Sequence, residues 1–361
     1  MDPILNYING EYVKPSSNDF IDVIDPAIGE KYTVVANSNK NDIDKAVNAA
    51  KESFLEWSAL SIKDRSNFLT QIANEIEKNL DEFAYLETKD TGKPISLSKK
   101  IDIPRAISNF RFFAEHAKTF HFESKIDDDN SSNVIARFPL GVVGCISPWN
   151  LPLYLFTWKI APAIISGNTV VAKPSEISPL TANKLGEVLT EINFPRGVIN
   201  IVHGDGNSAG SEIVRHPNIK AISFTGGTNT GTKIAQDSSS TLKKLSLEMG
   251  GKNPAIIFDD CNYSNMIETI TKSSFSNQGQ ICLCSSRLLI QSSIYEKFKS
   301  DLIDSVSKLK IGDPNEVDTE FGAISSKGHY DKIISYIELA KKEGGNILTG
   351  GDSLNIPGRC N

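Results

Sequence analysis

Short runs of β-branched and other apolar residues alternate with helical stretches from residue 142 onward, and this alternation constrains the fold more than any other feature. Helical stretches, such as residues 180–192, separate most of the apolar runs. Strands that alternate with helices build a parallel sheet that is covered by helices on both faces. The sequence therefore predicts an α/β fold with a doubly wound sheet, whose strands are Val142–Ile146, Thr169–Ala172, Val198–Val202, Ala221–Phe224 and Ala255–Phe258.

The N-terminal segment has a different pattern. An Asn9-Gly10 pair indicates a β-hairpin near the start of the chain. Apolar residues then recur at helical spacing, which predicts helices within residues 43–54, 69–80 and 107–117.

Composition excludes several classes of function. A length of 361 residues predicts two or three domains, and a net charge of −6 without a Lys/Arg block argues against binding to nucleic acid. No apolar run is long enough to span a membrane, and the N-terminus does not resemble a signal peptide. The cysteines have neither a disulfide framework nor zinc-ligand spacing, so we expect reduced thiols, a cytoplasmic location and no metal. They are Cys145, Cys261, Cys282, Cys284 and Cys360.

Three segments at the ends of predicted strands are candidates for nucleotide binding. Residues 200–206 and 224–231 are glycine-rich turns, and glycine allows backbone N–H groups to approach a phosphate. Neither turn has the G-x-G-x-x-G spacing, so spacing alone favours plain tight turns. Lys173 and Glu176 follow a third predicted strand, where ligands of doubly wound sheets bind. A solvated Lys–Glu pair explains these two residues equally well.

Cys282, Glu248 and Asn150 are candidates for covalent chemistry. A thiol and a nearby carboxylate form the pair that nucleophilic catalysis requires, one as nucleophile and the other as base. The Asn150 amide, within Ser147-Pro148-Trp149-Asn150-Leu151-Pro152, can donate to a developing oxyanion. Each residue has a simpler explanation when it is taken alone: a buried cysteine, a surface carboxylate and an asparagine in a turn.

Taken together, these segments resemble the aldehyde dehydrogenase superfamily over almost the whole chain. The resemblance rests on Phe275–Cys282, Leu247–Pro254, the Pro-Trp-Asn loop and residues 224–231. Among its branches, the sequence is most similar to the 2-aminomuconic semialdehyde dehydrogenases. The resemblance implies that an aldehyde is oxidised to an acid with NAD as the cofactor.

The resemblance assigns roles to individual residues. Cys282 attacks the aldehyde carbonyl, Asn150 and the Cys282 N–H stabilise the oxyanion, and Glu248 activates the water that hydrolyses the thioester. A Glu at position 176 binds the ribose hydroxyls and disfavours a 2′-phosphate, so NAD is expected rather than NADP. The implied NAD contacts are Ser147, Trp149, Lys173, Glu176, Gly206, Phe224, Gly226, Gly227, Gly231 and Met249.

The substrate and one departure from the family pattern also follow from the resemblance. Arg105 matches a substrate-pocket position, where it can pair with a carboxylate, and Trp158 is expected to line the substrate tunnel. A helix-surface charge and a core aromatic are the alternatives. Gly227 stands where many members have Ser, so one hydroxyl contact to a phosphate is absent.

The resemblance also implies a domain organisation. Residues 1–119 and 138–247 form the NAD-binding domain, residues 120–137 a hairpin for homo-oligomer assembly, and residues 248–361 a catalytic domain that is C-terminally truncated. The polar segment 127–133 fits a loop or a disordered tip, whereas residues 333–342 predict a helix and 346–348 a strand.

The family continues into a Glu-Ile-Phe-Gly-Pro segment that is not found here. A catalytically silent chain that binds nucleotide or partner subunits is therefore one alternative. A CoA-acylating relative is another, although that chemistry needs no water-activating base such as Glu248.

Overall fold

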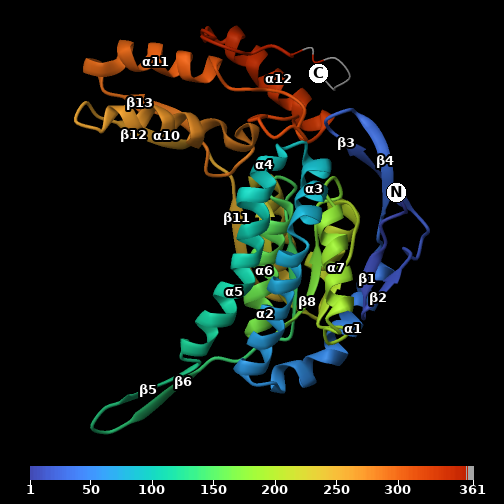
Figure 1. Cartoon of the computed structure of the whole chain (residues 1–361). Helices are drawn as coiled ribbons and strands as arrows, with labels where there is room; N and C mark the ends of the chain where they lie inside the picture. The colour runs from blue at the N-terminus through green and yellow to red at the C-terminus, as the bar shows by residue number, and fades with distance from the viewer. Residues whose placement is uncertain (355, 357–361) are drawn as a thin grey trace.

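The computed structural model describes residues 1–354 and 356, so Cys360 lies outside the described residues. Among these residues, seven strands form one large sheet in the order β11-β10-β7-β8-β9-β1-β2 (Figure 1). Strands β7 to β11 are parallel, whereas β1 and β2 are antiparallel to their neighbours. Their bounds are β1 (Asn6–Ile8), β2 (Glu11–Val13), β7 (Val142–Ile146), β8 (Thr169–Lys173), β9 (Ile199–Ile201), β10 (Ile219–Gly226) and β11 (Lys244–Met249). The prediction of a doubly wound α/β fold is confirmed, but β11 was not predicted as a strand. The predicted strand Ala255–Phe258 is not part of the large sheet, because this segment pairs in a separate two-stranded sheet.

The strand order creates a switch point in the middle of the sheet. The parallel part of the sheet starts at β7 and continues outward through β8 and β9, and the chain then returns to place β10 and β11 on the other side of β7. Doubly wound sheets bind ligands in the crevice outside the carboxyl ends of their strands at such a reversal. The fold therefore locates the expected site between β7 and β10.

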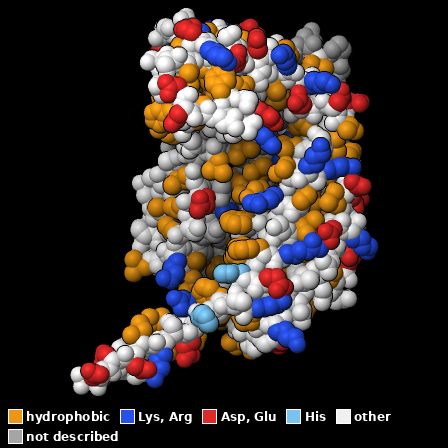
Figure 2. Space-filling model, turned by 60° about the vertical axis from the view of Figure 1, so that its left-hand side comes forward, with side chains coloured by type: hydrophobic (Ala, Val, Ile, Leu, Met, Phe, Trp, Pro, Cys, Tyr) orange, Lys and Arg blue, Asp and Glu red, His pale blue; other side chains and the backbone are white. Residues whose placement is uncertain are grey.

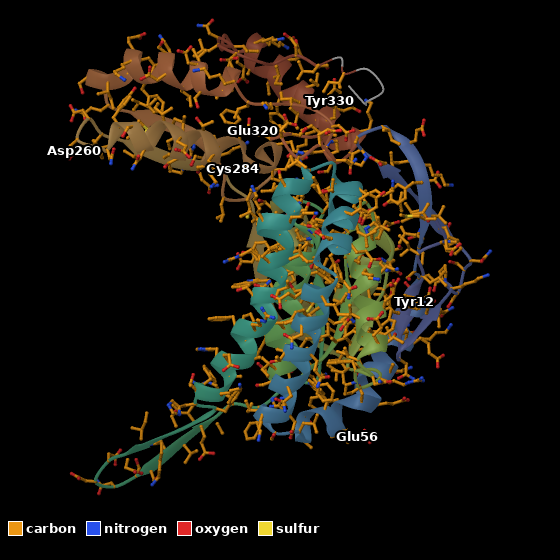
Figure 3. The ribbon with its side chains drawn as sticks, viewed as in Figure 1. Tyr12, Glu56, Asp260, Cys284, Glu320 and Tyr330 are labelled. Carbon is orange, nitrogen blue, oxygen red and sulfur yellow. The ribbon has the colours of Figure 1, made fainter. Side chains whose placement is uncertain are left out.

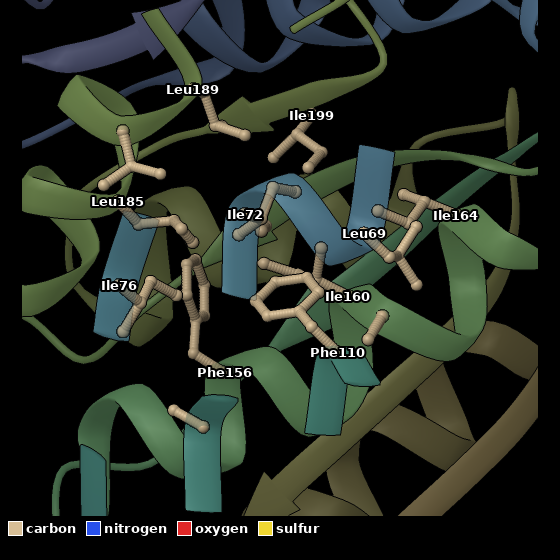
Figure 4. Packing of buried hydrophobic residues seen from close by; sticks show 14 of the residues in the cluster. Leu69, Ile72, Ile76, Phe110, Phe156, Ile160, Ile164, Leu185, Leu189 and Ile199 are labelled. Carbon is tan, nitrogen blue, oxygen red and sulfur yellow. The ribbon is translucent and has the colours of Figure 1, made fainter. Parts of the chain in front are cut away.

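Helices cover both faces of the sheet because its central strands are apolar on both sides. Along β7, Val143 and Cys145 belong to one core cluster, and Val142 and Ile146 belong to the other. The first cluster packs against α2 (Ile62–Lys78), α5 (Ile103–Thr119), α6 (Pro152–Ile165) and α7 (Leu180–Glu191) (Figure 4). The second packs against α1 (Lys40–Ala59), α8 (Ser211–Arg215) and α9 (Thr228–Ser238). The helices predicted within 43–54, 69–80, 107–117 and 180–192 are thus present.

Short elements join these layers and complete the N-terminal part. Helix α3 leads through α4 and a π-helical segment into α5, and β3 and β4 form a separate hairpin. Their bounds are α3 (Leu80–Thr91), α4 (Ile95–Leu97), π segments Ser98–Asp102 and Gly206–Gly210, a 3₁₀ turn Ser239–Thr241, β3 (Phe20–Asp25) and β4 (Glu30–Ala36).

The C-terminal elements form a smaller group above the carboxyl ends of the large sheet (Figure 1). Its core contains Ile257, Ile270 and Phe298. The predicted strand at 346–348 is wrong: these residues are irregular and follow the Gly344-Gly345 pair that ends the preceding helix. The elements are β12 (Asn253–Ile257), α10 (Tyr263–Phe275), β13 (Ser285–Ile290), α11 (Tyr295–Ser307), α12 (Lys327–Lys342) and 3₁₀ turns Ser276–Gly279 and Ser292–Ile294.

A two-stranded hairpin projects from the large body (Figure 1). It consists of β5 (Glu123–Asp127) and β6 (Ser132–Ala136), and all residues of both strands are exposed. The polar segment 127–133 forms the tip of this hairpin, where Asp128 accepts hydrogen bonds from the backbone N–H groups of Asn130 and Ser131 in the turn. None of the described helices is both long and apolar enough to cross a bilayer.

Candidate active site

The predicted cofactor residues lie together at the carboxyl edge of the large sheet. Lys173, Gly226 and Met249 are the last residues of β8, β10 and β11, and Ser147 directly follows β7. Gly206 opens the short helical segment that follows β9. Segments that are far apart in the sequence therefore meet at the switch point, where the fold locates a ligand.

Lys173 and Glu176 form an ion pair at the end of β8. The Lys173 Nζ lies 3.1 Å from Glu176 Oε2 and also donates to the Pro174 carbonyl at 3.0 Å. The lysine is buried, while the Glu176 side chain is one-third exposed. The neighbouring Ser147 donates its backbone N–H to the Lys173 carbonyl, and its buried hydroxyl has no partner among the described residues.

The N-terminus of α9 provides unpaired backbone donors beside the ends of β10 and β11. Gly227 is the N-cap, and no side chain caps the helix. A Cβ at Gly231 would come within 2.5 Å of Met249 Sδ, so a larger residue would displace the flexible Met249 side chain. In contrast, a side chain at Gly227 would meet nothing within 4 Å. Crowding therefore does not explain why Gly227 replaces the Ser found in many family members.

His203 follows β9 and lies close enough to Lys173 to interact with it electrostatically. Both ring nitrogens are buried without a partner among the described residues. Burial, aided by the Lys173 charge, lowers the pKa of His203 to about 3. The folded protein therefore binds fewer protons at this residue than the unfolded chain does between about pH 3 and pH 6.5.

We expect His203 to make the protein acid-sensitive. Because its pKa is lower in the folded state, its contribution to the free energy of unfolding falls as the pH drops below 6.5. The free energy of unfolding should fall by about 2 kcal/mol between pH 6.5 and pH 5 because of this residue. Urea unfolding at both pH values measures it. His203→Leu should flatten the dependence and the exposed His121→Leu should not; equal slopes in His203→Leu and the parent would contradict the assignment.

The loop before Cys282 has an unusual backbone. Asn277 and Gln278 have φ angles of 53° and 56°, and Gly279 follows at 72°. Such left-handed conformations cost non-glycine residues about 1–2 kcal/mol each, so the surroundings must hold them in place. Gln278 Nε2 donates to the Ala323 carbonyl at 2.7 Å, and the buried Gln280 accepts from the N–H and hydroxyl of Ser325. Strain held in this way is typical of functional loops.

Asn150 connects this loop to the end of β7. Its side-chain amide donates to the Gln280 carbonyl at 2.7 Å, and its own carbonyl accepts from Asn277 Nδ2 at 3.0 Å. An amide group has two N–H donors, so one remains for a ligand. The predicted oxyanion donor therefore lies against the chain segment that carries Cys282.

Cys282 faces the end of β11. A Cβ at Gly250 would lie 4.0 Å from the Cys282 Cβ, and Glu248 precedes that glycine by two residues. Asn253 Nδ2 fixes the loop by donating to the carbonyls of Cys282 at 2.7 Å and Cys284 at 3.1 Å. Burial raises the pKa of Cys284, which lies where the C-terminal elements meet the large body (Figure 3). This favours the prediction that Cys284 is a passive neighbour.

Lys159 is a buried cation on α6 that contacts the end of β10. Its Nζ donates to Thr225 Oγ1 at 2.6 Å, and it interacts electrostatically with Glu248. Burial lowers the pKa of Lys159 and raises that of Cys145 to about 12, so Cys145 is an inert thiol.

Arg105 on α5 and Trp158 on α6 both contact Tyr154. Arg105 Nη2 donates to the Tyr154 hydroxyl at 3.0 Å, and the guanidinium lies 5.2 Å from the centre of that ring. Trp158 packs edge-on against Tyr154 and Phe113 and remains 41% exposed. Trp158 is therefore not a core residue. Figure 2 shows hydrophobic side chains gathered in the recessed face between the C-terminal elements and the projecting hairpin.

Several residues at the site were not predicted from the sequence. Asn277 and Gln280 are polar residues whose importance depends on the fold of the loop. Trp149 was predicted as a cofactor contact, but its packing partner His329, 4.8 Å away between ring centres, comes from the distant helix α12. Within the described residues, no cluster of three or more His, Cys, Asp or Glu side chains could hold a metal ion.

The sequence model of the aldehyde dehydrogenase family matches residues 12–359. The chain belongs to the aldehyde dehydrogenase family. This confirms the resemblance inferred from the Cys282, Glu248 and Asn150 segments, and chance agreement of motifs is no longer a useful explanation.

Individual members of the family are similar over nearly the whole chain. The 2-aminomuconic semialdehyde dehydrogenase of Homo sapiens is 46% identical over 98% of this chain and 73% of its own length. The 5-carboxymethyl-2-hydroxymuconate semialdehyde dehydrogenase of Escherichia coli is 40% identical over 97% of this chain and 74% of its own length. PnpE from Pseudomonas sp. WBC-3, solved in complex with nicotinamide adenine dinucleotide, superimposes with a TM-score of 0.96 at 39% identity. That match covers 98% of this chain and 73% of PnpE.

Proposed function

We propose that this aldehyde dehydrogenase oxidises an acid-bearing aldehyde to the corresponding carboxylic acid with NAD. The observation that supports the reaction best is the meeting of three separate segments at the switch point. The Asn150 amide bonds to the loop before Cys282, and the residue after Met249 lies against Cys282 itself. A nucleophile, an oxyanion donor and a candidate base are thus brought to one edge of the sheet.

The residues at this edge fit NAD. The uncapped N-terminus of α9 suits a pyrophosphate, because its backbone N–H groups and helix dipole favour an anion. The one-third exposed carboxylate of Glu176 can accept hydrogen bonds from ribose hydroxyls, whereas a 2′-phosphate at that position would be repelled. The open space at Gly227 and Gly206 allows close approach to the backbone. The structure of PnpE with nicotinamide adenine dinucleotide supports the same cofactor.

The chemistry then divides among three side chains. The Cys282 thiolate adds to the aldehyde carbon, and the carbonyl oxygen becomes an oxyanion that Asn150 Nδ2 and the Cys282 N–H stabilise. Bound NAD supplies the acceptor for the hydride that leaves this carbon. A thioester on Cys282 remains. Glu248 takes a proton from water, which attacks the thioester and releases the acid and the thiolate.

Lys159 has a supporting role in this scheme. Its buried ammonium lies in the electrostatic field of Glu248 and is fixed by Thr225, the residue paired with Glu248 across β10 and β11. The charge of Glu248 favours the protonated form of Lys159 and so opposes the effect of burial, which lowers the pKa of this lysine.

Arg105 is the residue proposed to select the substrate. Its guanidinium is held by Tyr154, and the exposed ring of Trp158 packs against the same tyrosine. Arg binds carboxylates in a bidentate manner. The related enzymes that are named for muconic semialdehydes support an aldehyde with an acid group at its other end.

Arg105→Ala is expected to raise KM for an acid-bearing semialdehyde about 10- to 100-fold, because a charge-assisted contact contributes roughly 1.5–3 kcal/mol. KM for a neutral aldehyde of similar size should change less than twofold. Steady-state kinetics with both substrates measures the difference. Arg111→Ala is the matched control, since Arg111 lies on the same helix but pairs with Glu77 on the surface. Equal effects of Arg105→Ala on both aldehydes would contradict the proposal.

We extend the proposal to the organisation of the molecule. Residues 1–119 and 138–247 are the NAD-binding domain, and residues from 248 onward are catalytic, although the boundary lies inside β11. The hairpin within 120–137 joins copies of the chain, because an isolated two-stranded hairpin with exposed Ile126, Val134 and Ile135 needs a partner. The unpaired thiols among the described cysteines support a cytoplasmic location.

A further inference from the structure

A buried ionic cluster lies outside the residues that react. It contains Lys93, Glu87 and Asp102, whose side chains are 0%, 0% and 1% exposed. Lys93 Nζ lies 2.8 Å from Asp102 Oδ2 and 3.4 Å from Glu87 Oε1. Glu87 belongs to α3, Lys93 lies in the loop that follows it, and Asp102 ends the π-helical segment before α5.

This cluster is poorly explained by stability alone. Two carboxylates share one ammonium, and burial raises the pKa of both Glu87 and Asp102. Asp102 Oδ1 has no hydrogen-bond partner among the described residues. Replacing such a buried cluster by apolar residues is often neutral or stabilising, so its presence needs another reason.

The third contact of Lys93 provides that reason. Its Nζ donates to the backbone carbonyl of Asn150 at 3.0 Å, and Asn277 Nδ2 donates to the same oxygen. Glu87 Oε2 accepts the backbone N–H of Leu153 at 3.3 Å, further along the same loop. The cluster therefore holds both ends of the segment that carries the Asn150 amide.

The direction of the Asn150 side chain depends on this backbone. One N–H of its amide bonds to the Gln280 carbonyl. The other N–H must point toward the oxygen of the aldehyde that is bonded to the Cys282 sulfur. A displacement of about 1 Å at a reacting centre can cost about 100-fold in rate. Fixing the Asn150 backbone by a buried charge is a way to keep that displacement small.

We propose that Lys93 is a positioning residue for the oxyanion donor: its ammonium, held by Glu87 and Asp102, fixes the Asn150 backbone so that the Asn150 amide meets the developing oxyanion on Cys282. The proposal rests on the oxyanion role assigned to Asn150 under the proposed function. Lys93 acts through Asn150 and contacts neither the substrate nor the cofactor.

A double-mutant cycle on the purified enzyme tests this. Lys93→Met should lower kcat about 10- to 100-fold while KM for the aldehyde and Kd for NAD change less than twofold. In an Asn150→Ala background, the same Lys93→Met change should lower kcat less than twofold further, because the interaction on which it acts is already gone. Arg65→Met is the matched control: it removes a buried cation that donates to the carbonyls of Leu60 and Ile165, and should leave kcat unchanged.

Lys93→Met leaves two carboxylates without a counterion and can prevent folding. The neutral triple variant Glu87→Gln/Lys93→Met/Asp102→Asn removes that difficulty and carries the same prediction. Unchanged kcat in a folded Lys93 variant, or losses that multiply with those of Asn150→Ala, would overturn the positioning role and leave the proposed function intact. Full turnover by Asn150→Ala alone would overturn the oxyanion role and this proposal with it.

Discussion

Cys282→Ser is expected to abolish aldehyde oxidation. A serine hydroxyl at this position is hardly ionised near neutral pH, and no described feature of the loop supplies the strong base that a serine nucleophile needs. The expected loss is several orders of magnitude in kcat, on the scale of the roughly 10⁶-fold loss when a protease loses its nucleophile. NADH absorbance with a saturating aldehyde measures it.

Two controls separate loss of chemistry from loss of structure. Cys282→Ser should bind NAD with unchanged Kd, because the cofactor residues come from the strand ends of the large sheet. Cys284→Ser should retain turnover within about threefold, since burial raises the pKa of that thiol and keeps it unreactive. Substantial oxidation by Cys282→Ser, or its loss in Cys284→Ser alone, would refute the assignment of the nucleophile.

Glu248→Gln is expected to stop the enzyme after half a catalytic cycle. The glutamine cannot take a proton from water, so thioester hydrolysis should slow about 10²- to 10⁴-fold, the usual contribution of a general base. Formation of the thioester does not require that base. Mixing the variant with NAD and aldehyde should therefore release about one NADH per active site in a fast burst, followed by a slow steady rate.

The same experiment discriminates the CoA-acylating alternative. An enzyme that transfers its acyl group to CoA would lose little in Glu248→Gln when CoA is present and would consume CoA in each turnover. We expect no CoA consumption by the parent enzyme. Glu268→Gln, an exposed position on α10, is the matched control and should show no burst. A full steady-state rate in Glu248→Gln without CoA would remove Glu248 from the mechanism.

The sequence was sufficient for the fold class and for most of the strand ends that carry the site. Strands β7 and β8 are buried on both faces, so their apolar runs are unbroken and easy to identify. In contrast, β11 alternates between exposed and partly buried residues at the sheet edge, and its sequence was interpreted only as a motif around Glu248. At residues 346–348, a short apolar run predicted a strand, but none forms there. Strand formation depends on a pairing partner as much as on β-branched residues.

The site itself shows where local patterns stop being informative. Cys282 and Asn150 could be selected because they lie in characteristic sequence segments. Lys93 could not, because a lysine before proline in a loop predicts a solvated charge, and only the packed structure places it against Asn150. His329 likewise gains its contact with Trp149 from tertiary structure alone. A residue that acts through a second residue cannot be recognised from the spacing of a sequence motif, because the two residues lie on elements that are distant in the sequence.

The central claim is that Cys282 carries the substrate as a thioester, and intact-protein mass spectrometry tests it directly. Glu248→Gln, quenched in acid after the NADH burst, should show one added acyl group, and peptide mapping should place it on Cys282 with Cys284 unmodified. A burst of NADH without any acyl adduct, or an adduct on a residue other than Cys282, would contradict the account.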